Sequence, residues 1–188
     1  MRHVVRSAGA VAAAGVFALL TAGPSNAAAG VTPQQQPAAT SVADYDPDID
    51  AIVCEINKER DDHNLPALLI SDTASDVARA HAGDMATMDK LTSIGSDGRD
   101  LRTRLSDAGI YSQYIEEFLF HGYASDGYFA DMATDPEPSD GFYKVLMSSD
   151  VVALGLGYDD QYWDVNLLGP HRHLVVRTPS CSASTTTE

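Results

Sequence analysis

The sequence predicts an α+β fold in which helices come first and strands come later. Between residues 49 and 88, apolar side chains recur at the spacing of an amphipathic helix. Between residues 117 and 177, short runs of aliphatic and aromatic residues alternate with turn residues, which is the pattern of strands. The sequence contains no internal repeat. Helices gathered early and strands gathered late are typical of α+β domains with a mainly antiparallel sheet.

Three early segments carry the signals of helices. Residues 49–63 have apolar positions on one face, and Asp48 is available as an N-cap. Residues 71–88 have Ser71 in the same role, with alanine, methionine and His81 on the apolar face. The turn-rich stretch that follows leads into a short predicted helix at about 100–108.

The later segments predict strands and one more helix. The predicted strands cover residues 117–123, 151–158, 162–168 and 173–177. A polar turn at 159–161 joins the middle two into a β-hairpin. A short helix is expected around 126–134, and the two prolines in 135–141 predict a loop.

The N-terminus reads as a secretory signal peptide. Arg2 and Arg6 precede an apolar, uncharged run at 8–23, and small residues at 25–27 suit cleavage near Ala27. The apolar run is short for a membrane-spanning helix, although a retained N-terminal anchor stays open as the alternative. The domain organisation expected is a signal peptide at 1–27, a flexible leader at 28–45, one folded domain at 46–181 and a disordered tail at 182–188. No transmembrane segment is expected after cleavage.

The charge balance excludes some partners. The formal net charge is −15, and removal of Arg2 and Arg6 with the signal peptide would take it to about −17. Such a field repels phosphate backbones and anionic membrane surfaces, so nucleic-acid binding is not expected. Solubility outside the cell accounts for the acidity without a specific cation-binding role.

The two cysteines, Cys54 and Cys181, predict one disulfide in an exported chain. This bond would place the C-terminal segment alongside the first helix, because bonding requires Cα atoms no more than about 7 Å apart. Two free thiols remain the alternative. A zinc site of cysteine ligands would need more of them than the chain has.

Five short motifs, taken in order, resemble bacterial SCP domains of the CAP superfamily, which includes cysteine-rich secretory proteins, antigen 5 and pathogenesis-related proteins. The motifs are Asn57-Lys58-Glu59-Arg60 with Leu65-Pro66-Ala67-Leu68, Ala78-Arg79-Ala80-His81-Ala82 with Asp84-Met85-Ala86, Asp97-Gly98-Arg99 before Arg104-Leu105 and Ala108-Gly109, Gly155-Leu156-Gly157-Tyr158, and Tyr162-Trp163. The resemblance implies a three-layered α-β-α sandwich with a central cleft. In many members, two histidines and two acidic residues in that cleft can hold a divalent metal.

Carried over position by position, the cleft site of the family is mostly absent from this chain. Ser93 and Gly141 stand where the resemblance places the two histidines, and Ala153 stands in place of one glutamate. Glu117 alone is retained, and Phe118 replaces the asparagine that normally follows it. We therefore predict no metal ligand, no cofactor and no catalytic residue.

Other polar and aromatic residues could line the cleft. His81 lies on the apolar face of its helix, while Phe118 and His121 belong to the 117–123 strand. His121 should share a face with Glu117, because strand side chains alternate. His171 and His173 are two residues apart, a spacing that suits metal ligation, but two solvated histidines are the more common arrangement.

The functional expectation is a secreted, non-catalytic domain that binds a small apolar ligand of the lipid or sterol class, or an unknown extracellular partner. Loss of the charged cleft residues would favour an apolar guest. The alternatives are a metal-assisted hydrolase and a purely structural interaction module at the cell surface.

Overall fold

The computed structural model describes residues 45–136 and 141–181. The predicted signal peptide, residues 28–44 of the predicted leader and the predicted tail lie outside the described residues. Tyr45, the last residue of the predicted leader, contacts residues of the folded domain. Its ring lies 4.9 Å from that of Tyr158, and its hydroxyl donates to Asp126 Oδ1 at 2.5 Å.

Four of the five helices in the described residues, α1 to α4, begin where a side chain caps a backbone N–H group of the first turn. The helices are α1 (Ile49–Asp62), α2 (Asp72–Met88), α3 (Leu101–Asp107), α4 (Asp126–Thr134) and α5 (Phe142–Leu146). The Asp48 carboxylate accepts from the backbone N–H of Ala51 at 2.9 Å, and the Ser71 hydroxyl accepts from that of Ala74 at 3.3 Å. The predicted N-caps of α1 and α2 are confirmed. Helix α5 was not predicted. None of the helices in the described ranges has both the length and the apolar character to cross a bilayer.

Four strands form one mixed sheet, and the predicted α+β class with mainly antiparallel pairing is confirmed. The strands are β1 (Leu69–Ile70), β2 (Ile115–His121), β3 (Ala153–Asp159) and β4 (Tyr162–Leu168), in the order β1-β3-β4-β2. The β3–β4 and β4–β2 pairs are antiparallel, and β1 pairs with β3 in parallel. The predicted hairpin turns through Asp160 and Gln161, which both have positive φ, as a two-residue type I′ loop requires.

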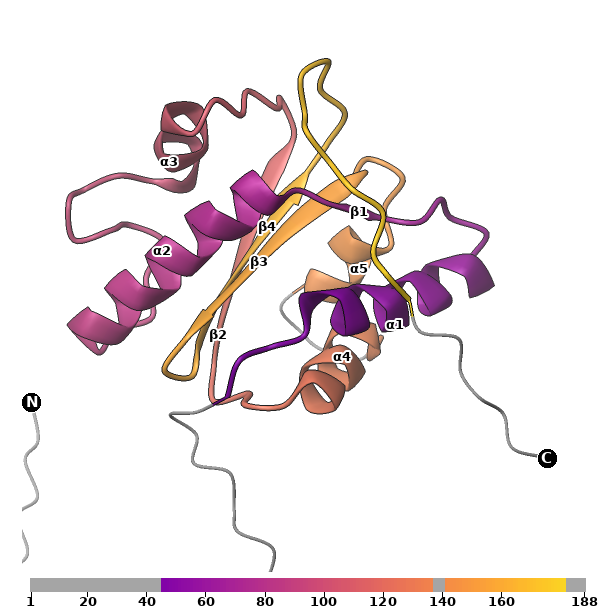
Figure 1. The fold of residues 1–188 in the computed structure, drawn as a ribbon, viewed down its shortest axis with the longest axis horizontal. Coiled ribbons are helices and arrows are strands. Elements are labelled where there is room, and N and C mark those ends of the chain that lie inside the picture. The colour runs from indigo at the N-terminus through magenta and orange to yellow at the C-terminus, as the bar shows by residue number, and fades with distance from the viewer. Residues whose placement is uncertain (1–44, 137–140, 182–188) are drawn as a thin grey trace, which may run out of the picture. The chain divides into compact units, whose positions relative to one another are not determined.

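Helices cover both faces of the sheet (Figure 1). Because side chains alternate along each strand, Phe118, Phe120 and Trp163 join the core cluster that also holds residues of α1, α4 and α5. The opposite face contributes Ala153 and Leu168 to a cluster with Ala74 of α2 and Leu105 of α3. Figure 1 shows the same division, with α2 and α3 on one side of the strands and α1, α4 and α5 on the other.

Residues 173–177 do not form the regular strand that the sequence predicts. Only one antiparallel bridge forms there, in which Ile70 N donates to Arg177 O at 2.9 Å and Arg177 N donates to Ile70 O at 2.8 Å. The partner strand β1 has only two residues, so it offers no longer ladder. The C-terminal segment is therefore an extended chain with a single point of pairing.

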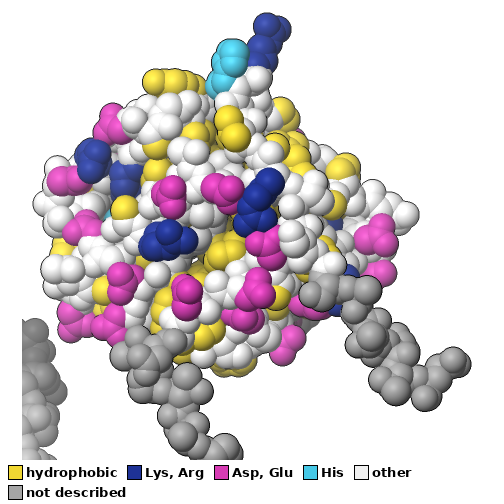
Figure 2. Space-filling view, viewed as in Figure 1, with side chains coloured by type: hydrophobic (Ala, Val, Ile, Leu, Met, Phe, Trp, Pro, Cys, Tyr) yellow, Lys and Arg dark blue, Asp and Glu magenta, His cyan; other side chains and the backbone are white. Residues whose placement is uncertain are grey.

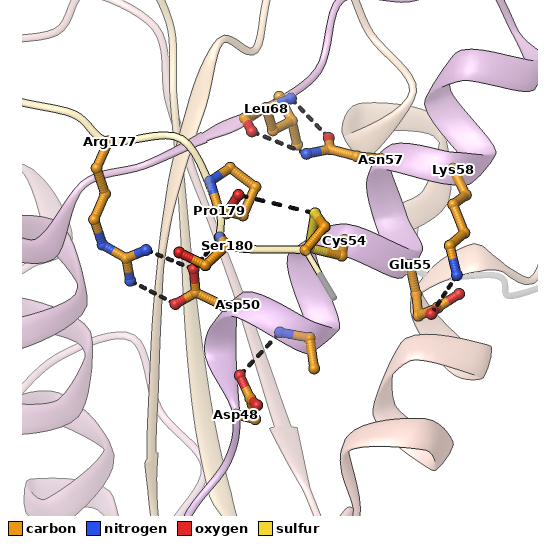
Figure 3. Close-up of a disulfide and its surroundings, with 12 residues drawn as sticks. Asp48, Asp50, Cys54, Glu55, Asn57, Lys58, Leu68, Arg177, Pro179 and Ser180 are labelled. Atoms are coloured by element: carbon orange, nitrogen blue, oxygen red, sulfur yellow. Dashed lines mark hydrogen bonds and ion pairs between the residues drawn. A yellow bond between two sulfur atoms is a disulfide. The ribbon is translucent and has the colours of Figure 1, made fainter. Parts of the chain in front are cut away.

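The predicted disulfide between Cys54 and Cys181 is confirmed, with a Cα–Cα distance of 5.6 Å. It fastens the C-terminal segment against α1, and Figure 3 shows Pro179 and Ser180 lying beside that helix. The same contact includes Arg177, whose guanidinium donates to both oxygens of Asp50 at 2.7 and 2.8 Å.

The Asn-Lys-Glu-Arg motif of α1 anchors irregular backbone. The Asn57 amide donates to Leu68 O at 3.0 Å and accepts from Leu68 N at 2.7 Å. Arg60 is 1% exposed, and its guanidinium donates to Pro66 O at 2.9 Å and to Ser148 O at 3.2 Å. The motif thus satisfies buried carbonyl groups of two loops that have no ladder partners.

Candidate functional site: a buried polar cluster beneath α2

Two glycines allow α2 to lie directly on strand β3. A Cβ atom added at Gly155 would come within 2.3 Å of the Ala74 carbonyl carbon. At Gly157 it would come within 2.0 Å of the Arg79 backbone nitrogen. Both distances are far shorter than any allowed contact, so only glycine permits this approach. The Gly-Leu-Gly motif therefore sets the depth at which α2 places His81 against the sheet.

Strand register brings two acidic side chains to the face that α2 covers. Glu117 of β2 pairs with Asn166 of β4, and Leu119 pairs with Asp164. All four lie on one face because their positions alternate with Phe118 and Val165, which face the other helices. Asp164 is fully buried.

His81, Arg104, Glu117 and Asp164 together form what we call the buried polar cluster. His81 is 2% exposed, and the side chains of Arg104 and Glu117 are 8% and 9% exposed. One ring nitrogen of His81 and one carboxylate oxygen each of Glu117 and Asp164 lie within 4.8 Å of one another. Four ionisable groups from α2, α3, β2 and β4 therefore meet in one small buried volume.

Arg104 is the cation of this cluster. Its Nη2 donates to Glu117 Oε1 in a buried ion pair. Its Nη1 donates to Ser93 O at 3.1 Å and to Arg99 O at 3.0 Å. Arg104 therefore holds the loop before α3 against strand β2, and it pairs with the buried negative charge of Glu117.

Burial shifts the pKa values of Glu117, Asp164 and His81 in the direction that favours their neutral forms. Desolvation raises the pKa of Glu117 to about 7 against the opposing attraction of Arg104. Desolvation, reinforced by the charge of Glu117, raises the pKa of Asp164 well above its usual range. Desolvation and the nearby Arg104 lower the pKa of His81. These shifts favour the neutral imidazole of His81 and the protonated carboxyl group of Asp164.

A pocket of about 220 Å³ leads to the cluster from solvent. His81 and Arg104 belong to its lining, and Asp84, Asp97 and Arg99 contribute charged groups to it. A hydrogen bond joins two residues of its lining, because the Asp84 carboxylate accepts from Ser96 N at 2.6 Å. The Ser96 hydroxyl, helped by this backbone N–H, lowers the pKa of Asp84.

The structure gathers only some of the positions that the family resemblance singled out. Ser93 meets the cluster through its backbone carbonyl, which accepts from Arg104, and Glu117 lies within it. Ala153 faces the same side of the sheet but packs in the apolar cluster with Leu105. Gly141 precedes α5, in the helical layer on the opposite face. These four positions do not surround a single pocket among the described residues.

The other candidate residues are also divided between the two faces. His81 joins the cluster, as its place on the apolar face of α2 allows. Phe118 packs against Phe142 on the opposite face, with ring centroids 4.9 Å apart. His121 is exposed at the end of β2, with its ring 4.5 Å from that of Tyr162. Neither Phe118 nor His121 lines the pocket that leads to the cluster.

Sequence reasoning missed Asp164 and Arg104, although a signal for each exists. Asp164 is an acidic residue within a strand that is buried at every position, which is unusual for a carboxylate without a partner. Arg104 follows the Asp-Gly-Arg turn and sits on the buried face of α3 with Leu101 and Leu105.

A second depression, of about 360 Å³, lies between α3 and the segment that enters β2. We call it the α3 groove. Its lining combines apolar side chains with polar ones: Arg102, Leu105, Ser106, Ile110, Tyr111, Ser112, Gln113 and Ile115. Tyr111 is 62% exposed at its edge.

Comparison with known proteins gives a family and a fold. The model of the cysteine-rich secretory protein family, CAP, matches residues 53–168. No curated protein matches the chain.

Three solved structures resemble the chain. An extracellular protein with an SCP domain from Bacillus anthracis is 24% identical, with a TM-score of 0.57, and the match covers 63% of this chain and 39% of that protein. An outer surface protein from Borrelia burgdorferi is 19% identical, with a TM-score of 0.54 and coverage of 64% and 90%. A cysteine-rich secretory protein from Staphylococcus aureus is 14% identical, with a TM-score of 0.52 and coverage of 63% and 37%. These similarities concern the fold, and the chain spans about two fifths of the Bacillus protein.

Proposed function

The chain belongs to the cysteine-rich secretory protein (CAP) family, and from this membership we propose that it is an extracellular, non-catalytic domain that binds a small amphiphilic ligand in the α3 groove. The extracellular location is supported by the disulfide, which persists in oxidising compartments, and by the signal-peptide pattern at 1–27.

The absence of catalysis is inferred from the state of Glu117. A general base must be within reach of a substrate proton, and a nucleophile needs an adjacent base. Glu117 is 9% exposed and is already paired with Arg104. By the resemblance, Ser93, Gly141 and Ala153 stand at the positions of the other family site residues. A hydrolase would need groups that this site no longer offers at those positions.

The ligand class follows from the lining of the α3 groove, which is the observation that carries this proposal. Leu105, Ile110 and Ile115 supply an apolar floor, and exposed Arg102 provides a cation at the rim. The volume of about 360 Å³ falls in the range of small-molecule sites. An apolar body with an anionic end, as in a fatty acid or a sulfated sterol, matches both features.

The positive charge of Arg102 at the rim of the α3 groove stands out on an acidic surface. The chain is strongly acidic, and Figure 2 shows acidic side chains spread over the visible face with fewer basic ones between them. An anionic ligand would be repelled from most of such a surface, so a local cation beside an apolar floor gives the groove its selectivity.

A fluorescent fatty-acid probe tests the proposal. We expect saturable binding of one probe per chain, weakened about tenfold by Arg102→Glu, since a lost charge-assisted contact costs roughly 1.5–3 kcal/mol. Tyr111→Ala should also weaken binding. Arg79→Glu is the matched control, because Arg79 is exposed on α2 and does not line the groove. Failure of the unaltered chain to bind at saturating probe, or equal effects of the two charge reversals, would contradict the assignment.

A further inference from the structure

The buried polar cluster contains strongly desolvated atoms that no protein group satisfies. Both carboxylate oxygens of Asp164 and the Nδ1 atom of His81 lack a hydrogen-bond partner in the described ranges 45–136 and 141–181. Asp164 is fully buried and His81 is 2% exposed. Leaving such groups unpaired costs about 1–3 kcal/mol each, so unsatisfied buried polar atoms in native proteins call for an explanation.

The hydrogen bond of His81 determines which of its nitrogens is available. His81 Nε2 lies 2.8 Å from the backbone oxygen of Thr92. A carbonyl oxygen can only accept, so Nε2 carries the proton and donates. The lone pair is then on Nδ1, the nitrogen without a partner. A histidine whose other nitrogen donates to a backbone carbonyl is the usual arrangement of a metal ligand.

We propose that His81, Glu117 and Asp164 form a binding site for one divalent transition-metal ion, with zinc as the probe ion. One potential ligand atom of each residue lies within 4.8 Å of the others. Ligand atoms around a tetrahedral zinc ion are about 3.3–3.5 Å apart at bond lengths near 2.0–2.1 Å. The three side chains would therefore have to move only slightly toward one another to bind the ion. One imidazole and two carboxylates are an established kind of ligand set for such ions.

The site differs from the one that the family resemblance implies. It shares Glu117 with the cleft positions, but it uses His81 of α2 and Asp164 of β4 in place of Ser93, Gly141 and Ala153. An ion bound there would join α2 to strands β2 and β4, and therefore stabilise the packing of the helix on the sheet.

Arg104 is the internal competitor for this ion. Metal binding would require both carboxyl groups in their ionised form. A divalent ion would neutralise their combined charge of −2, whereas Arg104 compensates only one negative charge. The guanidinium of Arg104 also contacts the carbonyls of Ser93 and Arg99, so it has acceptors other than Glu117. Binding would require Arg104 to release Glu117 and keep these carbonyl contacts.

The pocket beside the cluster provides a path for a cation. His81 and Arg104 belong both to the cluster and to the lining of this pocket, to which Asp84, Asp97 and Arg99 also contribute.

Calorimetric titration of the chelator-treated chain with zinc tests the site. We expect one tight ion per chain and at least a tenfold loss of affinity in Asp164→Asn, which keeps the shape of the side chain. The control is the double variant His171→Ala/His173→Ala. These histidines lie on the loop after β4, which projects at the top of Figure 1, with ring centroids 5.9 Å apart, and could chelate zinc on their own. Loss of the tight ion in the control with retention in Asp164→Asn would overturn the proposal.

A second variant separates metal binding from a purely structural cluster. Arg104→Gln removes the competing cation, so zinc affinity should rise at least tenfold, and zinc should raise the melting temperature of this variant more than that of the unaltered chain. A structural cluster would instead be destabilised by Arg104→Gln with no response to zinc. Absence of stoichiometric zinc from both the unaltered chain and Arg104→Gln would refute the site. It would leave the ligand-binding proposal for the α3 groove untouched.

Discussion

At the scale of single residues, Asp50 shows how one carboxylate secures the C-terminal segment. It accepts two hydrogen bonds from Arg177 and one from Ser180 N at 2.6 Å (Figure 3). The Arg177 guanidinium, helped by the Ser180 N–H, lowers the pKa of Asp50 below its usual value. A carboxyl group with a lowered folded-state pKa stabilises the fold above its unfolded pKa and loses that contribution as the pH falls.

The first prediction follows from this pairing. Asp50→Asn should lower the free energy of unfolding at pH 7 by about 1 kcal/mol, a modest value because Arg177 is partly exposed to solvent. The difference from the unaltered chain should shrink as the pH falls below about 4, where the unfolded carboxyl also becomes protonated. Urea unfolding at pH 7, 5 and 3 measures the difference. Asp76→Asn is the control, because the Asp76–Arg79 pair is exposed at 3.4 Å. A gap that stays constant down to pH 3 would contradict this account.

At the scale of elements, the contact of α2 with β3 depends on two glycines in a strand. Glycine normally weakens a strand, but here side chains at Gly155 and Gly157 would overlap the backbone of α2. The close approach seats Ala74 and Ala78, which are fully buried, on the sheet. The same approach brings His81 to the buried polar cluster.

The second prediction is that Gly157→Ala destabilises the domain by roughly 2–3 kcal/mol, since the added methyl group would force α2 away from β3. Gly127→Ala serves as its control, because nothing lies within 4 Å of the corresponding Cβ in α4. Alanine there should be neutral or slightly stabilising, as alanine favours helices by up to about 1 kcal/mol over glycine. Thermal unfolding of the two variants compares them, and equal melting temperatures would exclude the steric explanation.

At the scale of the whole molecule, the disulfide joins two residues that are 127 positions apart. The C-terminal segment pairs with β1 only at Arg177, and besides the disulfide it is held against α1 by the hydrogen bonds of Arg177 and Ser180 to Asp50. The third prediction is that Cys54→Ser/Cys181→Ser lowers the free energy of unfolding by about 3–5 kcal/mol on the chain-entropy model for so long a loop. Denaturant unfolding measures it, and intact mass after alkylation without reductant should show no modified cysteine in the unaltered chain. A variant as stable as the unaltered chain would show that the tail is held by packing alone.

The sequence by itself determined the elements whose ends are set by neighbouring residues, such as helices with an N-cap and strands joined by a tight turn. Asp48 and Ser71 satisfy N–H groups within three residues of themselves, and the Asp160–Gln161 turn joins adjacent strands. The disulfide was also accessible from sequence, because export and an even cysteine count leave few alternatives. The strand predicted at 173–177 was wrong, because its length depended on a distant partner, β1, that is only two residues long.

Only the tertiary structure decided how the candidate site is composed. Whether Glu117 meets Arg104, and whether Asp164 is buried beneath α2, depends on strand register and on the depth at which Gly155 and Gly157 admit the helix. Sequence indicates which face of a helix or strand is apolar, since periodicity is a local property. It does not indicate which polar residues from four separate elements will share a desolvated volume, because that convergence is set by packing between segments far apart in the chain.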